Sequence, residues 1–95
     1  MAVQAPSRKR QNQTTEETAS PWQVVVLDDP VNLMAYVTRV IMRVFSYDQT
    51  RAENLMMQVH QRGRAVVWSG GREKAEMYVQ QLHQAQLHAS LERAG

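Results

Sequence analysis

Residues 24–34 read VVVLDDPVNLM, and the change of pattern inside this stretch decides the fold. The apolar, β-branched half, extended back to Trp22, predicts a buried strand over Trp22–Leu27. After Pro30 the apolar residues recur every three or four positions, starting with Leu33, which predicts one face of a helix. Asn32 is a residue type that favours helix N-caps, so we expect the helix to begin there.

The sequence beyond this helix alternates between the same two patterns. The further elements predicted are a helix over Gln49–Gln61 ended by Gly63, a strand over Arg64–Trp68, a turn at 69–71, a helix over Arg72–Leu87 and a strand over His88–Glu92. The order is therefore β-α-α-β-α-β. In so short a chain this order predicts an α+β fold, with a three-stranded antiparallel sheet packed against three helices.

The first twenty residues differ in composition from the rest of the chain. Residues 1–20 contain no Leu, Ile, Phe, Trp or Tyr. Such a segment buries too little apolar surface to offset its ordering entropy, so we predict a disordered N-terminal extension over 1–20 and one domain over 21–95. No apolar run approaches the length of a membrane span, and the chain has no cysteine, which suits a cytoplasmic protein.

Charge argues against a nucleic-acid-binding protein without excluding one. The chain has 11 Lys or Arg against 9 Asp or Glu, and no dense basic run stands in the folded region. Binding by phosphate neutralisation usually needs such a cluster. A small nucleic-acid-associated α+β domain is kept as the alternative function, using Arg39, Arg43, Arg62 and Arg64.

No pattern in the sequence predicts catalysis or a cofactor. Cysteine is absent, and so is the Gly-x-Ser-x-Gly motif that presents a nucleophilic serine. The three histidines, His60, His83 and His88, lack compact metal-ligand spacing. We therefore expect no enzyme, no metal and no other cofactor.

Two adjacent carboxylates, Asp28 and Asp29, stand where the strand gives way to the helix. They are either solvated loop residues near a helix N-terminus or a fixed pair of acceptors for a cation, since Pro30 holds Asp29 in an extended conformation. His60, in the last turn of its helix, is either a favourable charge near the helix dipole or part of the same site. Met34 lies close to the aspartates, where a flexible thioether could line an apolar pocket.

Four segments stand in the order and spacing of a known family. They are DDPVNLMAYV at 28–37, FSYD at 45–48, LMMQVHQRGRAVV at 55–67 and LERA at 91–94. Together they resemble the ClpS family, adaptors that hand N-degron substrates to a Clp protease. The resemblance spans Pro21 to Ala94, and the family's fold agrees with the element order given above.

The resemblance implies a site for the N-terminus of a substrate protein. Asp29 and His60 match the family's aspartate and histidine that hold the α-amino group, and Asp28 stands beside them where asparagine is common. An ammonium presents three donors and a charge, which a carboxylate and a neutral imidazole can accept. The residues that match the apolar pocket for the first side chain are Asn32, Met34, Val37, Met56, Val59 and Leu87.

The implied function is that of a non-enzymatic adaptor. It would bind proteins that begin with Phe, Tyr, Trp or Leu and deliver them to a Clp AAA+ unfoldase. By resemblance, Glu73, Glu76 and Tyr78 match the surface that meets the unfoldase's N-terminal domain. The expected partners are N-degron substrates and that domain, with no nucleic acid, no membrane and a monomeric adaptor.

Overall fold

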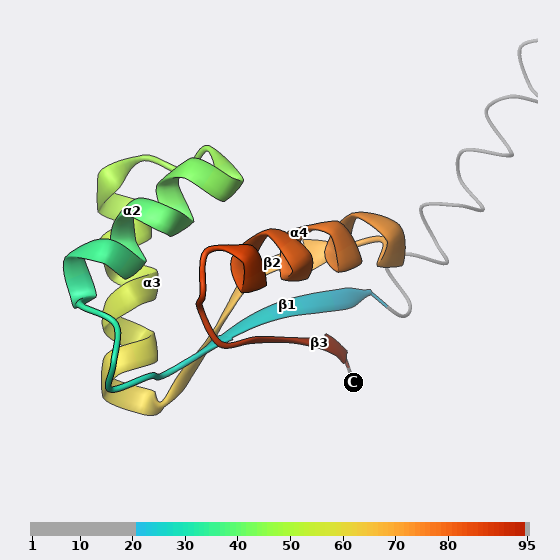
Figure 1. Ribbon diagram of the computed structural model, residues 1–95. Coiled ribbons are helices and arrows are strands. Elements are labelled where there is room, and N and C mark those ends of the chain that lie inside the picture. Colours follow the sequence, from blue (N-terminus) through green and yellow to red (C-terminus); the bar gives the residue numbers. More distant parts are fainter. Residues whose placement is uncertain (1–20, 95) are drawn as a thin grey trace, which may run out of the picture.

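The computed structural model describes residues 21–94 and has the predicted order of elements (Figure 1). The elements are β1 (Trp22–Leu27), α2 (Met34–Phe45), α3 (Gln49–Arg62), β2 (Arg64–Gly70), α4 (Arg72–Gln84) and β3 (Ala89–Arg93). The α+β prediction is confirmed, including the antiparallel sheet. The disordered extension predicted over 1–20 lies outside the described residues.

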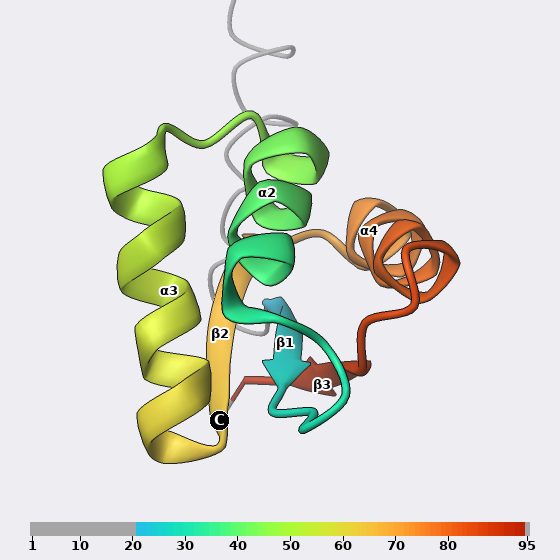
Figure 2. The same ribbon diagram turned by 60° about the vertical axis from the view of Figure 1, so that its left-hand side comes forward.

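The sheet has the strand order β2-β1-β3, so the most apolar strand lies in the centre. α2 and α3 form a hairpin at one end of the sheet, and α4 runs over the strands (Figures 1 and 2). Val24 and Val26 of β1 pack in the main core with Ile41 of α2 and Leu82 of α4, and all four are at most 1% exposed. This core fixes the point at which β1 ends and the chain turns toward α2.

Val25 points to the other face of the sheet and is also fully buried, although it lies outside that core cluster. Arg64 of β2 and Glu92 of β3 form an ion pair that reaches across β1. The strand register and the alternation of side chains place Arg64, Glu92 and Val25 on the same face. The aliphatic part of the Arg64 side chain therefore helps to cover this face of β1.

The first helix begins later than predicted. Leu33, and not Asn32, is the N-cap of α2, with an extended backbone and no capping hydrogen bond from its side chain. The Asn32 side chain is unavailable for capping because its amide donates to Asp29 and to the Gln86 carbonyl. Leu33, predicted on the buried face, is 76% exposed.

The third helix ends earlier than predicted, at Gln84. Gln86 adopts a left-handed conformation with φ of 68°, and the Leu87 N–H donates to the Leu82 carbonyl at 3.0 Å while the Gln86 N–H donates to His83 at 2.9 Å. These two bonds form the Schellman motif, which ends helices at a left-handed residue. The turn releases Leu87 from the helix, and the last strand begins at Ala89 and not at His88.

The second strand is longer than predicted and contains a bulge. β2 continues through Gly70, where the sequence suggested a turn from Ser69. The register with β1 shifts around Val67, whose carbonyl accepts a hydrogen bond from the Tyr47 hydroxyl at 2.8 Å. The loop between α2 and α3 thereby satisfies a backbone group that the irregular ladder leaves free.

Candidate functional site

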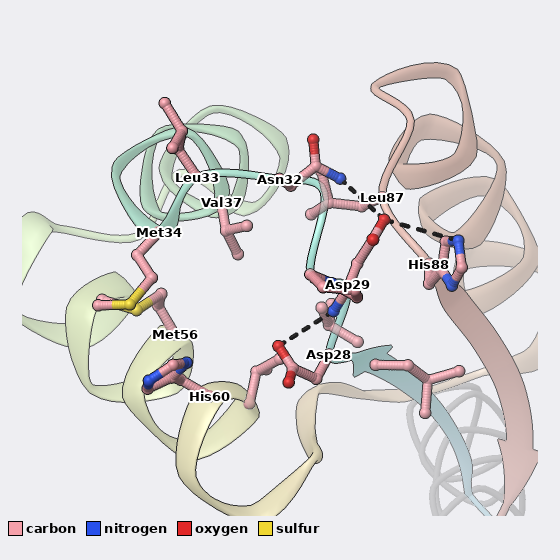
Figure 3. A pocket seen from close by; sticks show the side chains of 14 residues that line it. Asp28, Asp29, Asn32, Leu33, Met34, Val37, Met56, His60, Leu87 and His88 are labelled. Carbon is pink, nitrogen blue, oxygen red and sulfur yellow. Dashed lines mark hydrogen bonds and ion pairs between the residues drawn. The ribbon is translucent and has the colours of Figure 1, made fainter.

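A pocket of about 470 Å³ opens where β1 gives way to α2 (Figure 3). Four parts of the chain form it: the loop after β1, the start of α2, the last turns of α3 and the segment after α4. All nine residues predicted for the amine site and the apolar pocket line it, namely Asp28, Asp29, Asn32, Met34, Val37, Met56, Val59, His60 and Leu87. The structure thus brings together residues that are far apart in the sequence.

The floor of the pocket is apolar and tightly packed. Met56 and Val59 of α3 and Leu87 are 8%, 4% and 3% exposed, and Val37 of α2 is half-buried. Met34, the first residue of α2, is 42% exposed and stands nearer to solvent. A ligand group that entered would bury apolar surface against fixed side chains while Met34 adjusted at the mouth.

The acidic loop is fastened to its neighbours through its backbone. The Leu27 N–H donates to the His88 carbonyl at 2.9 Å, which extends the pairing of β1 and β3 by one residue. The Asp28 N–H donates to the Gly63 carbonyl at 2.9 Å, where Gly63 ends α3 with φ of 85°. The loop that carries the carboxylates is therefore held from both sides.

The Asp29 carboxylate has a fixed orientation. Its Oδ1 accepts from the Val31 N–H at 2.9 Å, and its Oδ2 accepts from Asn32 Nδ2 at 3.2 Å. The Asp28 carboxylate accepts in turn from the Asp29 N–H at 3.0 Å. With a side chain only 13% exposed, Asp29 is a preorganised acceptor, since each carboxylate oxygen has a second lone pair.

His60 lines the pocket from α3, across from the Asp29 carboxylate (Figure 3). Its side chain is exposed and makes no hydrogen bond or ion pair with any other residue of the described range. Its ring nitrogens are thus open to a ligand. A carboxylate and an imidazole above an apolar floor suit a ligand that is cationic at one end and apolar at the other.

Sequence reasoning missed His88 as a residue of this site. His88 lines the pocket, and its Nε2 lies 3.6 Å from Asp29 Oδ2. Leu33 and Pro30 line it as well. No local pattern pointed to His88, because its place depends on the turn at Gln86 that ends α4 early.

The residues predicted to meet the unfoldase lie away from the pocket. Glu73 and Glu76 are exposed near the start of α4, at the end of the sheet remote from the acidic loop (Figure 1). Glu76 pairs with Arg72 at 3.4 Å, and the Tyr78 ring is half-buried, 4.7 Å from the ring centre of Phe45. Tyr78 therefore also supports the core.

The arginines of the alternative function do not form one basic stripe. Arg39 and Arg43 are exposed on α2, and Arg43 lies in its last turn. Arg62 lies in the last turn of α3, at the other end of the helical hairpin (Figure 2), and Arg64 is paired with Glu92. This distribution disfavours phosphate neutralisation along a nucleic acid. Within residues 21–94 no group of three or more His, Asp or Glu is placed to hold a metal ion.

Comparison with known proteins identifies the family. The family model described as the ATP-dependent Clp protease adaptor protein ClpS matches residues 17–92. The chain belongs to the ClpS family. The predicted resemblance is confirmed. The function of the family is that of an adaptor of the ATP-dependent Clp protease, and this function applies to the chain.

Relatives named ATP-dependent Clp protease adapter protein ClpS match over most of their length. The Mycobacterium marinum protein is 47% identical over 90% of this chain and 84% of its own, and the Rhodococcus opacus protein 48% identical over 93% and 79%. Among solved structures, Agrobacterium tumefaciens ClpS2 bound to L-phenylalaninamide matches with a TM-score of 0.74 and 25% identity, over 79% of this chain and 98% of that one. No helix in the described part of this ClpS-family chain is long and apolar enough to cross a membrane.

Proposed function

We propose that this ClpS-family adaptor binds proteins by a free N-terminal amino group and a bulky apolar first residue, Phe, Tyr, Trp or Leu, and delivers them to a Clp AAA+ unfoldase. One observation carries the proposal: the fixed Asp29 carboxylate and the open His60 imidazole border the same apolar pocket. The similar ClpS2 structure supports it, because its ligand, L-phenylalaninamide, joins an amine to an aromatic side chain.

The amine end of the ligand meets the polar side of the pocket. An N-terminal ammonium has three N–H donors, which Asp29, Asp28 and His60 accept between them. Charge-assisted bonds of this kind are about twice as strong as neutral ones. An acetylated N-terminus lacks both the charge and two of the donors, so it should bind much more weakly.

The first side chain of the ligand enters the pocket and packs against its apolar residues. Val37, Met56, Val59 and Leu87 supply its walls, and Met34 adapts at the mouth. Side chains that branch beyond Cβ can reach the floor, whereas a second substituent on Cβ crowds the entrance beside the ligand's amine. Phe, Tyr, Trp and Leu therefore suit the pocket better than Ile and Val.

Delivery uses a surface separate from the pocket. We assign contact with the N-terminal domain of the unfoldase to Glu73, Glu76 and Tyr78, because they match the family's contact surface and lie on α4 outside the pocket. The adaptor domain comprises residues 21–95 and acts as a monomer without catalysis or a cofactor. A cytoplasmic location stays a prediction.

The test is a titration with fluorescent peptides that begin with Phe and carry either a free or an acetylated N-terminus. We expect the free peptide to bind at least tenfold more tightly, which corresponds to about 1.4 kcal/mol. A peptide with the same residues in scrambled order, beginning with Gly, is the control for the first side chain. Equal affinity for the free and acetylated peptides would overturn the proposal.

A further inference from the structure

A second imidazole faces Asp29 from the side opposite His60. The Nε2 atom of His88 lies 3.6 Å from Asp29 Oδ2, an ion-pair distance slightly longer than a hydrogen bond (Figure 3). The His88 side chain is 66% exposed, against 13% for Asp29. The imidazole thus stands at the rim of the pocket, in contact with solvent, beside a carboxylate that is nearly buried.

The fold determines where His88 stands. Its carbonyl accepts from the Leu27 N–H, and the turn at Gln86 immediately precedes it. On the other side, His83 Nε2 lies 2.8 Å from the Ala89 carbonyl and donates to it, since a carbonyl can only accept. The backbone of His88 is therefore held at both ends, and its ring remains close to Asp29.

The donors around Asp29 give His88 a distinct role. Oδ1 is engaged by the Val31 N–H and Oδ2 by Asn32 Nδ2, both from the loop itself. His88 approaches Oδ2 from a different part of the chain. A neutral imidazole with a proton on Nε2 points a third N–H dipole at Oδ2, from 3.6 Å, and leaves a lone pair of Oδ1 for a ligand.

The effect of His88 on ligand binding at Asp29 reverses when the imidazole gains a proton. An imidazolium at this distance attracts the Asp29 carboxylate and adds a cation next to the place that a ligand's ammonium would take. Two cations would then compete for one carboxylate. The other titratable side chains around the pocket are Asp28, Asp29 and His60, while His83 of α4 contacts the neighbouring residue Ala89.

We propose that His88 is a positioning residue for Asp29: neutral, it orients the carboxylate for a ligand's amino group, and protonated, it competes with that group. The inference rests on the proposed function, since it assumes that Asp29 holds an ammonium. The inference makes His88 a further residue that sets the affinity for free N-termini. This affinity should fall on acidification because His88 as well as His60 gains a proton.

Two substitutions separate the donor from the charge. His88→Leu removes both, whereas His88→Gln keeps an N–H donor and cannot become charged. A Phe-initiated peptide is titrated into the full chain at about pH 8 and about pH 5.5, on either side of the range in which histidines change charge. Gln80→Leu is the control, because Gln80 is an exposed polar residue of α4 that does not line the pocket and makes no contact with the segment around His88.

We expect His88→Leu to weaken binding at the higher pH by about threefold, the lower end of the effect of a hydrogen bond because the contact is 3.6 Å long, and His88→Gln to restore most of this loss. Both variants should lose less affinity on acidification than wild type and the Gln80→Leu control do. A purely structural role would lower affinity by the same factor at both pH values. That result, or unchanged binding in His88→Leu, would overturn the inference.

The acetylated peptide separates this inference from the proposed function. If wild type prefers the free peptide but His88→Leu has the same pH dependence as wild type, only the role of His88 is wrong. If wild type binds the free and acetylated peptides equally, the amine site itself is wrong, and the role of His88 falls with it.

Discussion

Asn32 joins Asp29 to the end of α4. Its side-chain amide donates to Asp29 Oδ2 at 3.2 Å and to the Gln86 carbonyl at 3.0 Å. One side chain thus orients the carboxylate of the proposed amine site and ties its loop to the turn that presents Leu87 to the pocket. Predicted both as a helix cap and as a pocket residue, Asn32 lines the pocket, and Leu33 takes the position of the cap.

Replacing this amide tests the connection. Asn32→Ala should weaken binding of a Phe-initiated peptide by about threefold to tenfold, because Asp29 loses a donor that orients it. Asn54→Ala, at an exposed asparagine on α3, is the matched control and should leave affinity unchanged. Fluorescence anisotropy measures affinity, and thermal denaturation checks that both variants are folded. Equal affinities for the two variants would contradict the supporting role.

Tyr47 should stabilise the fold through the bulge in β2. Its hydroxyl donates to the Val67 carbonyl at 2.8 Å, and its ring stacks on Phe45. Tyr47→Phe keeps the ring and leaves the carbonyl without this donor, so the free energy of unfolding should fall by about 1 kcal/mol. Urea denaturation at neutral pH measures the change, with Tyr36→Phe, which loses a 2.8 Å bond to the Ala85 carbonyl, for comparison.

The same residue predicts how stability changes at alkaline pH. Burial raises the pKa of the Tyr47 hydroxyl, and the nearby Arg51 opposes this only in part. A raised pKa means that the folded state favours the protonated form. The stabilisation is therefore complete below about pH 10, the ordinary value for tyrosine, and is lost as the pH rises further. Tyr47→Phe should lose less stability than wild type over this alkaline range, and an identical loss would contradict the assignment.

Elements whose signal is local could be predicted from the sequence. The β-branched run before Asp28 predicts β1 with its correct bounds, and Gly63 ends α3 because a left-handed residue is needed there. The start of α2 and the end of α4 could not be predicted in this way. Asn32 is engaged by Asp29 and Gln86, and Gln86 adopts a left-handed conformation that is uncommon for a residue other than glycine.

The residues of the candidate site also divide into those that could be predicted from the sequence and those that could not. The resemblance to the family selected nine residues that all line the pocket, and eight of them lie in two of its segments, 28–37 and 55–67, while Leu87 lies outside. His88 lies outside any such motif, and its approach to Asp29 follows from the turn after α4 and the pairing of β3 with β1. A contact set by tertiary structure leaves no local pattern to find.

The pocket should select the first residue of a ligand by the branching of its side chain. Peptides that begin with Phe or Leu should bind at least tenfold more tightly than those that begin with Ile or Val, about 1.4 kcal/mol. The physical reason is crowding at the entrance by a second substituent on Cβ, beside the fixed Asp29 carboxylate. Titration of four peptides that differ only in this residue measures it. Equal affinities across the four would show that the entrance does not discriminate.

The final prediction concerns the joint action of Asp29 and His60. Asp29→Ala should lose a charge-assisted hydrogen bond to the ligand, about 1.5–3 kcal/mol, or roughly tenfold to a hundredfold in affinity. His60→Ala should lose less, because a neutral imidazole is a weaker acceptor than a carboxylate. Since both groups serve one ammonium, the two losses should not add in the double variant. Calorimetric titration with a Phe-initiated peptide gives the three free-energy differences.

Two features of the chain make this comparison of the single and double variants decisive. Glu53→Gln, at an exposed carboxylate on α3 outside the pocket, controls for the loss of negative charge as such and should leave affinity unchanged. The His60 side chain is exposed and makes no hydrogen bond within the described residues, so His60→Ala should change affinity without changing the thermal unfolding temperature. A histidine that served only the helix dipole would do the reverse. Unchanged affinity in Asp29→Ala would show that this site does not bind the amino group of the ligand.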